Sequence, residues 1–212
     1  MRVRPIIAVA FAVAIAASQA QATTLSGNLT VDNLFSAYIS TNDATPGTLI
    51  GSGADWGTTY SLTAATLTPG VTNYLQIVGI SYFPPAAFIG SFNLSDANFQ
   101  FANGTQTLLT DTTNWRSNPS GGSWFAPNGT PVSLGLNGIS PWGSHPTINA
   151  SAAWIWSDTS DTYGATAYFS TTITPTSATP LPSTWLMLLS GFVGLGFFAY
   201  RGTKRKTAAI AA

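Results

Sequence analysis

The chain has 212 residues, with seven basic residues, seven acidic residues and no Cys. Residues 23–180 contain seven Asp and a single basic residue, Arg116, so this stretch carries a net charge of −6. That balance argues against nucleic-acid binding, which needs clustered Lys or Arg, and the lack of Cys excludes disulfides and Cys-based metal or nucleophile sites. The length suits one domain between two terminal segments.

The first 22 residues have the pattern of a signal peptide. Arg2 and Arg4 give a positive start, and residues 6–17 form an apolar run that is too short to span a membrane. Ala20 and Ala22 fit the small-residue cleavage rule, and a cut two residues earlier competes with it. We therefore expect export through the Sec machinery and removal of residues 1–22.

Residues 23–174 contain short runs in which apolar and polar side chains alternate, with no convincing helical periodicity. In one run, Phe35, Ala37 and Ile39 share a face, and turn residues separate the runs from each other. The predicted strands are 35–40, 73–80, 86–94, 98–101, 105–110, 152–156 and 167–173, together with one that ends near Asp32. Seven or eight strands without repeats predict an all-β ectodomain, a single antiparallel β-sandwich of the jelly-roll type.

Asp32 and Asn33 lie at the centre of the predicted strand pair 29–40. Carboxylate and amide oxygens are ligands that Ca²⁺ prefers, which makes the two residues candidates for a Ca²⁺ or ligand site. The interpretation that we favour is structural: short polar side chains often bond backbone N–H groups at a strand turn. No other cofactor and no other metal is predicted.

Tryptophan rings fill the core when buried and can form a platform for flat sugar faces when exposed. Trp154 and Trp156 are two residues apart, so we expect them on one side of a strand and in the core. Trp124 and Trp142 lie in predicted loops, which makes them the better candidates for an exposed, ligand-binding platform.

His145 is the single His of the chain and lies in a Pro-flanked segment without a Gly-x-Ser-x-Gly motif. A catalytic triad would need His145 to meet a Ser and an Asp in space. We expect a loop residue instead, and we predict no catalytic residue and no enzyme activity. Convergence of Asp side chains with His145 in a cleft would favour the alternative, a hydrolase of envelope glycans.

A Thr/Pro-rich stalk at 175–180 precedes an apolar stretch that predicts a transmembrane helix over about 185–200. A helix of this length reaches about 24 Å, slightly short of the roughly 30 Å hydrocarbon core. The basic cluster that follows consists of Arg201, Lys204, Arg205 and Lys206. The positive-inside rule places this cluster in the cytoplasm, so we expect a membrane-anchored precursor with residues 207–212 as a short cytoplasmic end.

The segment PLPSTWLMLLSGFVGLGFFAYRGTKRK, residues 180–206, resembles the PEP-CTERM sorting tail of bacteria with exopolysaccharide-rich envelopes. The LLSG-x-x-GLG part is the most specific match, and Leu181 stands where the eponymous motif has Glu. The resemblance implies an exosortase-like processing enzyme that acts on the sorting motif Pro180, Leu181, Pro182, Ser183 and Thr184. LPSTW is also similar to a sortase motif, but Trp185 replaces the Gly that a sortase requires.

Residues of about 25–175 resemble the galactose-binding-domain-like jelly rolls of extracellular glycosidases and adhesins. The order LTVDN, then NYLQIVGI, then TDTTNW carries this resemblance, while TNDATPGT replaces a tight Asn-Gly hairpin at the ligand rim. We expect a non-enzymatic exported protein of the cell surface or extracellular matrix, with extracellular polysaccharide as a candidate partner. The alternatives are the glycan hydrolase and a purely structural or adhesive coat protein.

Overall fold

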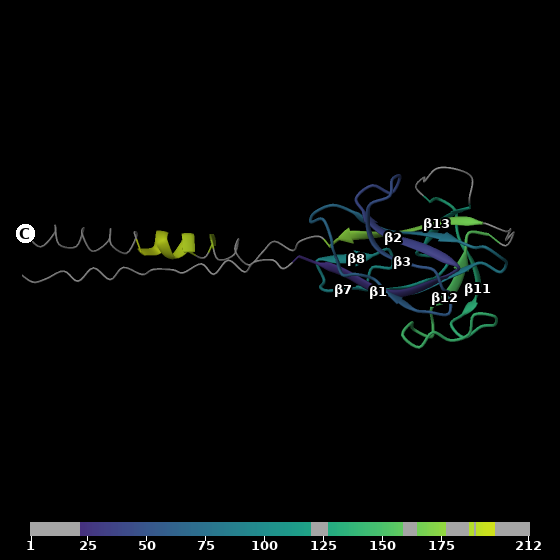
Figure 1. Cartoon of the computed structure of the whole chain (residues 1–212). Helices are drawn as coiled ribbons and strands as arrows, with labels where there is room; N and C mark the ends of the chain where they lie inside the picture. The colour runs from purple at the N-terminus through teal and green to yellow at the C-terminus, as the bar shows by residue number, and fades with distance from the viewer. Residues whose placement is uncertain (1–21, 120–126, 159–164, 177–186, 189, 198–212) are drawn as a thin grey trace, which may run out of the picture.

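The computed structural model describes residues 22–119, 127–158, 165–176, 187–188 and 190–197. Two antiparallel sheets are stacked face to face, and a helical segment lies outside them (Figure 1). The prediction of an all-β antiparallel sandwich is confirmed at this level.

Sheet A has seven strands in the order β11-β12-β7-β1-β4, with β5 also paired to β1 and β9 also paired to β7. Its strands are β1 (Thr24–Asp32), β4 (Tyr60–Ser61), β5 (Ala65–Thr66), β7 (Ala87–Leu94), β9 (Thr107–Leu109), β11 (Val132–Leu136) and β12 (Ala153–Trp156). Sheet B has six strands in the order β10-β13-β6-β2-β3, with β8 also paired to β13. Its strands are β2 (Leu34–Ser40), β3 (Thr48–Gly53), β6 (Asn73–Ile80), β8 (Phe99–Phe101), β10 (Arg116–Pro119) and β13 (Thr166–Pro175).

The predicted strands coincide with β1, β2, β6, β7, β8, β9, β12 and β13. The sequence-based prediction missed β3, β4, β5, β10 and β11, so the described residues hold thirteen strands and not seven or eight. Each of the five missed strands pairs with only one neighbouring strand, so its sequence need not alternate as strictly as that of a central strand. They are short or rich in Gly, Ser and Thr, which weakens the alternation that a strand prediction needs.

The core lies between the sheets and is dominated by aromatic rings. Phe88 of β7 contacts Trp115 edge-on at 5.2 Å between centroids, and it contacts Phe169 of β13 at 5.2 Å. All three rings are fully buried, and Trp115 Nε1 donates a hydrogen bond to the Leu109 carbonyl at 3.1 Å. Each ring of this size removes roughly 150–250 Å² from water, so these rings supply much of the stabilisation of a domain without disulfides.

The first strand, β1, begins at the same end of the sandwich at which the last strand, β13, ends (Figure 1). Pro175 of β13 pairs with Phe99 of β8, and the Ser95 N–H, in the connection between β7 and β8, donates to the Thr24 carbonyl at 3.0 Å. The opposite end holds the Asp32–Asn33 turn between β1 and β2. β13 ends one residue inside the predicted stalk, of which the structure describes only 175 and 176.

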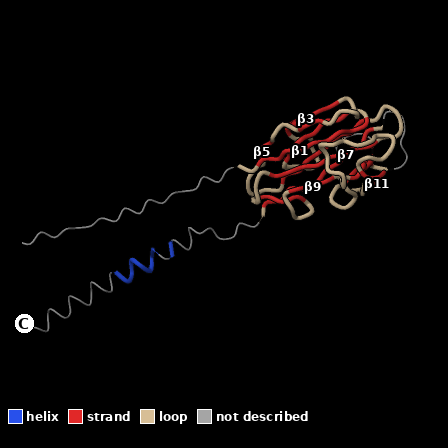
Figure 2. Tube along the Cα trace, turned by 90° about the horizontal axis from the view of Figure 1, so that it is seen from below, coloured by secondary structure: helices blue, strands red, loops and turns tan. Residues whose placement is uncertain are grey.

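The helical residues 187–188 and 190–197 lie apart from the sandwich, in blue in Figure 2. Six apolar side chains of this segment are between 52% and 73% exposed: Met187, Leu188, Phe192, Val193, Leu195 and Phe197. No helix among the described residues is long and apolar enough to cross a membrane, so the predicted span 185–200 is not found there. Residues 185, 186, 189 and 198–200 of that span lie outside the description.

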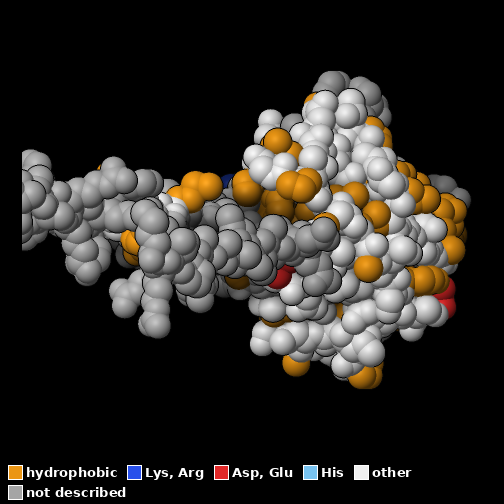
Figure 3. Space-filling model, turned by 90° about the vertical axis from the view of Figure 1, so that its left-hand side faces the viewer, with side chains coloured by type: hydrophobic (Ala, Val, Ile, Leu, Met, Phe, Trp, Pro, Cys, Tyr) orange, Lys and Arg blue, Asp and Glu red, His pale blue; other side chains and the backbone are white. Residues whose placement is uncertain are grey.

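Charged side chains are scarce on the described part of the face where β1 begins and β13 ends (Figure 3). The described surface there consists mainly of uncharged side chains and backbone, with apolar side chains scattered among them. This agrees with a chain of which only 7% is charged.

Candidate binding groove

The loop between β11 and β12, residues 137–152, packs against the outer face of sheet A. A second hydrophobic cluster lies beneath this loop, separate from the core between the sheets, and its buried members are Ala87, Ile89, Trp142, Ile148, Ala152 and Trp154. Part of the sandwich therefore has a third layer, which the sequence-based prediction did not include.

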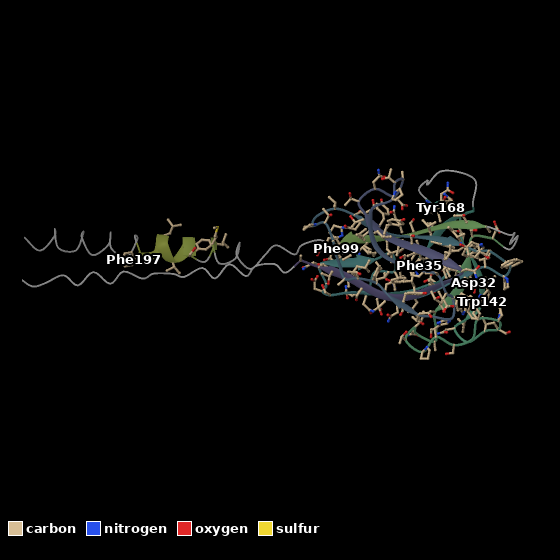
Figure 4. All side chains as sticks on the ribbon, in the orientation of Figure 1. Asp32, Phe35, Phe99, Trp142, Tyr168 and Phe197 are labelled. Carbon is tan, nitrogen blue, oxygen red and sulfur yellow. The ribbon has the colours of Figure 1, made fainter. Side chains whose placement is uncertain are left out.

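Trp142 is the centre of this layer. Its ring stacks on Trp154 at 5.0 Å and 25°, and its Nε1 donates to Asp32 Oδ2 at 3.0 Å. Figure 4 shows Asp32 and Trp142 together at the end of the sandwich far from the tail. Only 6% of Trp142 is exposed, so the prediction of an exposed platform in a loop is wrong: the loop folds back and buries the ring.

Trp154 and Trp156 are both buried, as predicted, but they do not face the same cluster. Trp154 packs outward under the loop, whereas Trp156 packs against Phe169 in the core at 5.6 Å. The prediction of a shared side is wrong because the alternation breaks at the end of β12, where the successive residues Ile155 and Trp156 both belong to the core between the sheets.

Asn33 has the structural role that we favoured. Its Oδ1 accepts a hydrogen bond from the Tyr82 N–H at 2.7 Å, and its own N–H donates to the Ile80 carbonyl at 2.8 Å. Asp32 is buried, and its Oδ2 accepts a hydrogen bond from the Trp142 indole N–H. In the part of the chain that is described, no group of three or more His, Cys, Asp or Glu is placed to hold a metal ion.

Asn137 organises the loop with its side-chain amide. Oδ1 accepts from the His145 N–H at 2.9 Å, while Nδ2 donates to the carbonyls of His145 at 3.0 Å and Ile148 at 2.9 Å. Gly138 follows with φ of +109°, a conformation that side chains other than glycine rarely adopt. One amide thus ties together backbone segments eight and eleven residues away.

His145 lies in the loop, as predicted, and is 4% exposed. Its Nδ1 is 2.8 Å from the Thr59 hydroxyl, and its ring contacts Trp154 edge-on at 5.4 Å. Burial lowers the pKa of His145 below its ordinary value of 6.5, which favours the neutral imidazole at pH 7. The described side chain bonded to the ring is the Thr59 hydroxyl, not a carboxylate of the kind that orients the imidazole in a catalytic triad.

A groove of about 800 Å³ runs between this loop and the strands β7 and β9 of sheet A. Ser91, Asn93, Thr107 and Leu109 line its floor, and residues 144–150 line its wall. Figure 2 views the molecule from this side and labels β7, β9 and β11. The Asn28 amide, from the neighbouring strand β1, donates to the Thr147 carbonyl at 3.3 Å and so ties the wall to the sheet.

Among the described residues, no charged side chain lines this groove, and the one titratable side chain in its lining is that of His145. The floor residues were missed as site candidates, although Ser91 and Asn93 alternate with the buried Phe92 and Leu94. That alternation identifies an outward-facing pair, but it does not indicate which loop covers the pair.

Several predicted site residues fall outside the described part of the chain. These are Ala20, Trp124, the sorting motif Pro180–Thr184 and the basic cluster Arg201, Lys204, Arg205 and Lys206. Ala22, of the predicted cleavage site, is exposed two residues before β1 begins.

Comparison of the chain with protein-family models, with curated proteins and with solved structures gives no match.

Proposed function

We propose that the chain is a non-enzymatic, exported protein of the bacterial cell surface or extracellular matrix, with extracellular polysaccharide as its partner. The observation that carries the proposal is the apolar helical segment outside the sandwich, with Met187, Phe192 and Phe197 each more than half exposed. Covering an apolar side chain of this size stabilises by about 1.5–3 kcal/mol, so the segment favours a membrane or another apolar partner.

The resemblance of residues 180–206 to PEP-CTERM tails supports sorting by an exosortase-like enzyme after Sec-dependent export. In this proposal the C-terminal segment first anchors the precursor, and the basic cluster stays on the cytoplasmic side. The start of β1 and the end of β13 lie at one end of the sandwich, which supports display of the whole sandwich on the far side of the anchor. A finer assignment, to the galactose-binding-domain-like jelly rolls, is part of the proposal.

The groove lining supports a non-enzymatic role. Glycoside hydrolysis uses two carboxyl groups on either side of the scissile bond, and the residues that line the groove include no Asp or Glu. His145 has Thr59 as its partner at 2.8 Å. A glycan hydrolase, one of the alternatives that we expected from the sequence, therefore ranks behind a binding role, and the structural or adhesive coat protein stays the second candidate.

The proposal is tested by locating the protein in a bacterial host. We expect the full chain in the membrane fraction, with its sandwich accessible to protease added to spheroplasts. A chain that ends at Ser177 should be exported but released from the membrane. A chain without residues 2–22 is the control and should stay protected inside the cell. Protection of the full chain from protease, or equal fractionation with and without the tail, would overturn the proposal.

A further inference from the structure

We propose that the groove between β7, β9 and residues 144–150 binds an uncharged polysaccharide. The inference rests on the proposed function, because it gives the site and the chemical class of the polysaccharide partner. It differs from the sequence-based candidates, since none of Asp32, Asn33 or Trp142 lines this groove and Trp124 lies outside the described residues.

The floor of the groove presents polar groups in a fixed array. Asn93 of β7 and Thr107 of β9 are direct cross-strand partners, and Ser91 lies two residues along the same face of β7, opposite Leu109. Directly opposed side chains have Cβ atoms about 4.5–5.5 Å apart, and residues two positions apart on a strand are about 6.6 Å apart. An amide and two hydroxyls therefore stand within the reach of one or two sugar rings.

The polar side chains at the floor of the groove make no hydrogen bond to other described residues. Elsewhere, side-chain amides bond the protein itself: Asn73 binds the backbone of Thr68 and Val71, and Asn103 binds that of Thr105 and Thr107. Five side chains of the groove make no such bond within the described residues: Ser91, Asn93, Thr107, Ser144 and Thr147. Their hydrogen-bonding groups are therefore available to a ligand.

The chemistry of the lining favours a neutral ligand. Amides and hydroxyls both donate and accept hydrogen bonds, as sugar hydroxyls do. Within the part of the chain that the structure describes, no charged side chain lines the groove to pair with a uronate, sulfate or phosphate. The surrounding ectodomain has seven acids and one base, so it repels a polyanion at low ionic strength.

The wall of the groove is held in place without a ligand. Asn137 fixes the backbone at residues 145 and 148, and Trp142 fixes the loop to Trp154 and Asp32. In a preformed site, less of the interaction free energy is lost in ordering the protein, which raises the affinity for a ligand that binds through weak neutral hydrogen bonds. The volume of about 800 Å³ accommodates an oligosaccharide segment rather than a single small ion.

The test uses the full chain in a neutral detergent and measures its retention by immobilised polysaccharides. The neutral probes are dextran, galactomannan and starch, and the anionic probes are alginate and hyaluronate. We expect retention by at least one neutral probe that does not change between low and high salt, and no retention by the anionic probes. Retention by none of the probes, or only by the anionic ones and only at low salt, would overturn the inference.

Two variants at the floor and one matched control locate the site. Asn93→Trp fills the groove and should weaken binding at least about tenfold, whereas Asn93→Ala removes one neutral hydrogen-bonding partner and should weaken it about fivefold. Ser52→Trp places the same ring at an exposed position of β3 in sheet B and should leave binding unchanged. Equal binding by Asn93→Trp and Ser52→Trp, with circular dichroism spectra like that of the wild type, would show that the polysaccharide does not bind in this groove. Localisation of the same chains tests the proposed function separately, because a surface-exposed protein that binds no neutral glycan refutes only the groove inference.

Discussion

Replacement of Trp142 tests whether the third layer holds the groove wall. Trp142→Ala removes a ring that is only 6% exposed, together with its stack on Trp154 and its hydrogen bond to Asp32. Truncation of a buried Trp costs about 3–5 kcal/mol of the free energy of unfolding. For a domain of this size each kcal/mol lowers the melting temperature by about 2–4 °C, so we expect a fall of about 6–20 °C.

Trp142→Phe separates the hydrogen bond from the packing. It keeps most of the apolar area and loses the indole N–H that donates to Asp32, a bond to a carboxyl group worth about 1.5–3 kcal/mol. Leu136→Ala is the control, because Leu136 is 59% exposed and its truncation should stay within about 0.5 kcal/mol.

The assay is urea-induced unfolding of the full chain, followed by circular dichroism. The expected order of stability is wild type and Leu136→Ala, then Trp142→Phe, then Trp142→Ala. A loss below about 1 kcal/mol for Trp142→Ala would refute the argument, because it would mean that the ring is not packed against the sheet.

Two further predictions concern His145 and Gly27. Burial lowers the pKa of His145, so the unfolded chain binds a proton at His145 more readily than the folded chain does. The contribution of His145 to the free energy of unfolding is therefore complete above about pH 6.5 and is lost as the pH falls below that value. We expect His145→Gln to reduce the difference in free energy of unfolding between pH 7.5 and pH 5, measured by urea titration, and an unchanged difference would contradict this assignment. Gly27→Ala places a Cβ 2.8 Å from the Ser91 carbonyl oxygen and should destabilise by about 1–3 kcal/mol in the same assay. Gly57→Ala, whose Cβ would meet only Asp55 Oδ1 at 3.4 Å, is the matched control, and equal stability of the two variants would count against the close approach of β1 and β7.

The central strands could be predicted from the sequence because two neighbours and a buried face impose an alternating pattern. β6 matches its predicted bounds, and in β2 the residues Phe35, Ala37 and Ile39 pack into the core as the pattern predicts. β11 could not be predicted, because it is an edge strand with a bulge between Ser133 and Gly135 that interrupts its alternation.

The burial of Trp142 could not be predicted from its neighbours in the chain. Pro and Gly around Trp142 indicate a loop, and loops usually lie at the surface. What buries the ring is Asp32, 110 residues earlier, and Trp154 on the next strand. Contacts over such separations depend on the register of β1 with β7 and of β7 with β12, which local patterns do not determine.

The groove, like the buried site of Trp142, is formed by residues that are far apart in the chain. The outward direction of Asn93 follows from the alternation along β7, but its neighbour Thr107 and the loop at 144–150 are brought there by strand pairing. A site built from neutral Ser, Thr and Asn also carries no motif, because these residues are abundant over the whole ectodomain.

The position of Pro175 determines how the sandwich responds to mechanical force. A pull on the chain beyond this residue acts along the axis of β13, which pairs with β6 at eight positions and also with β10 and β8. Hydrogen bonds of such a ladder are perpendicular to the strands and share a load along them, so they must break together rather than in sequence. The rate of unfolding, rather than the equilibrium stability, then decides how long the domain stays folded under tension.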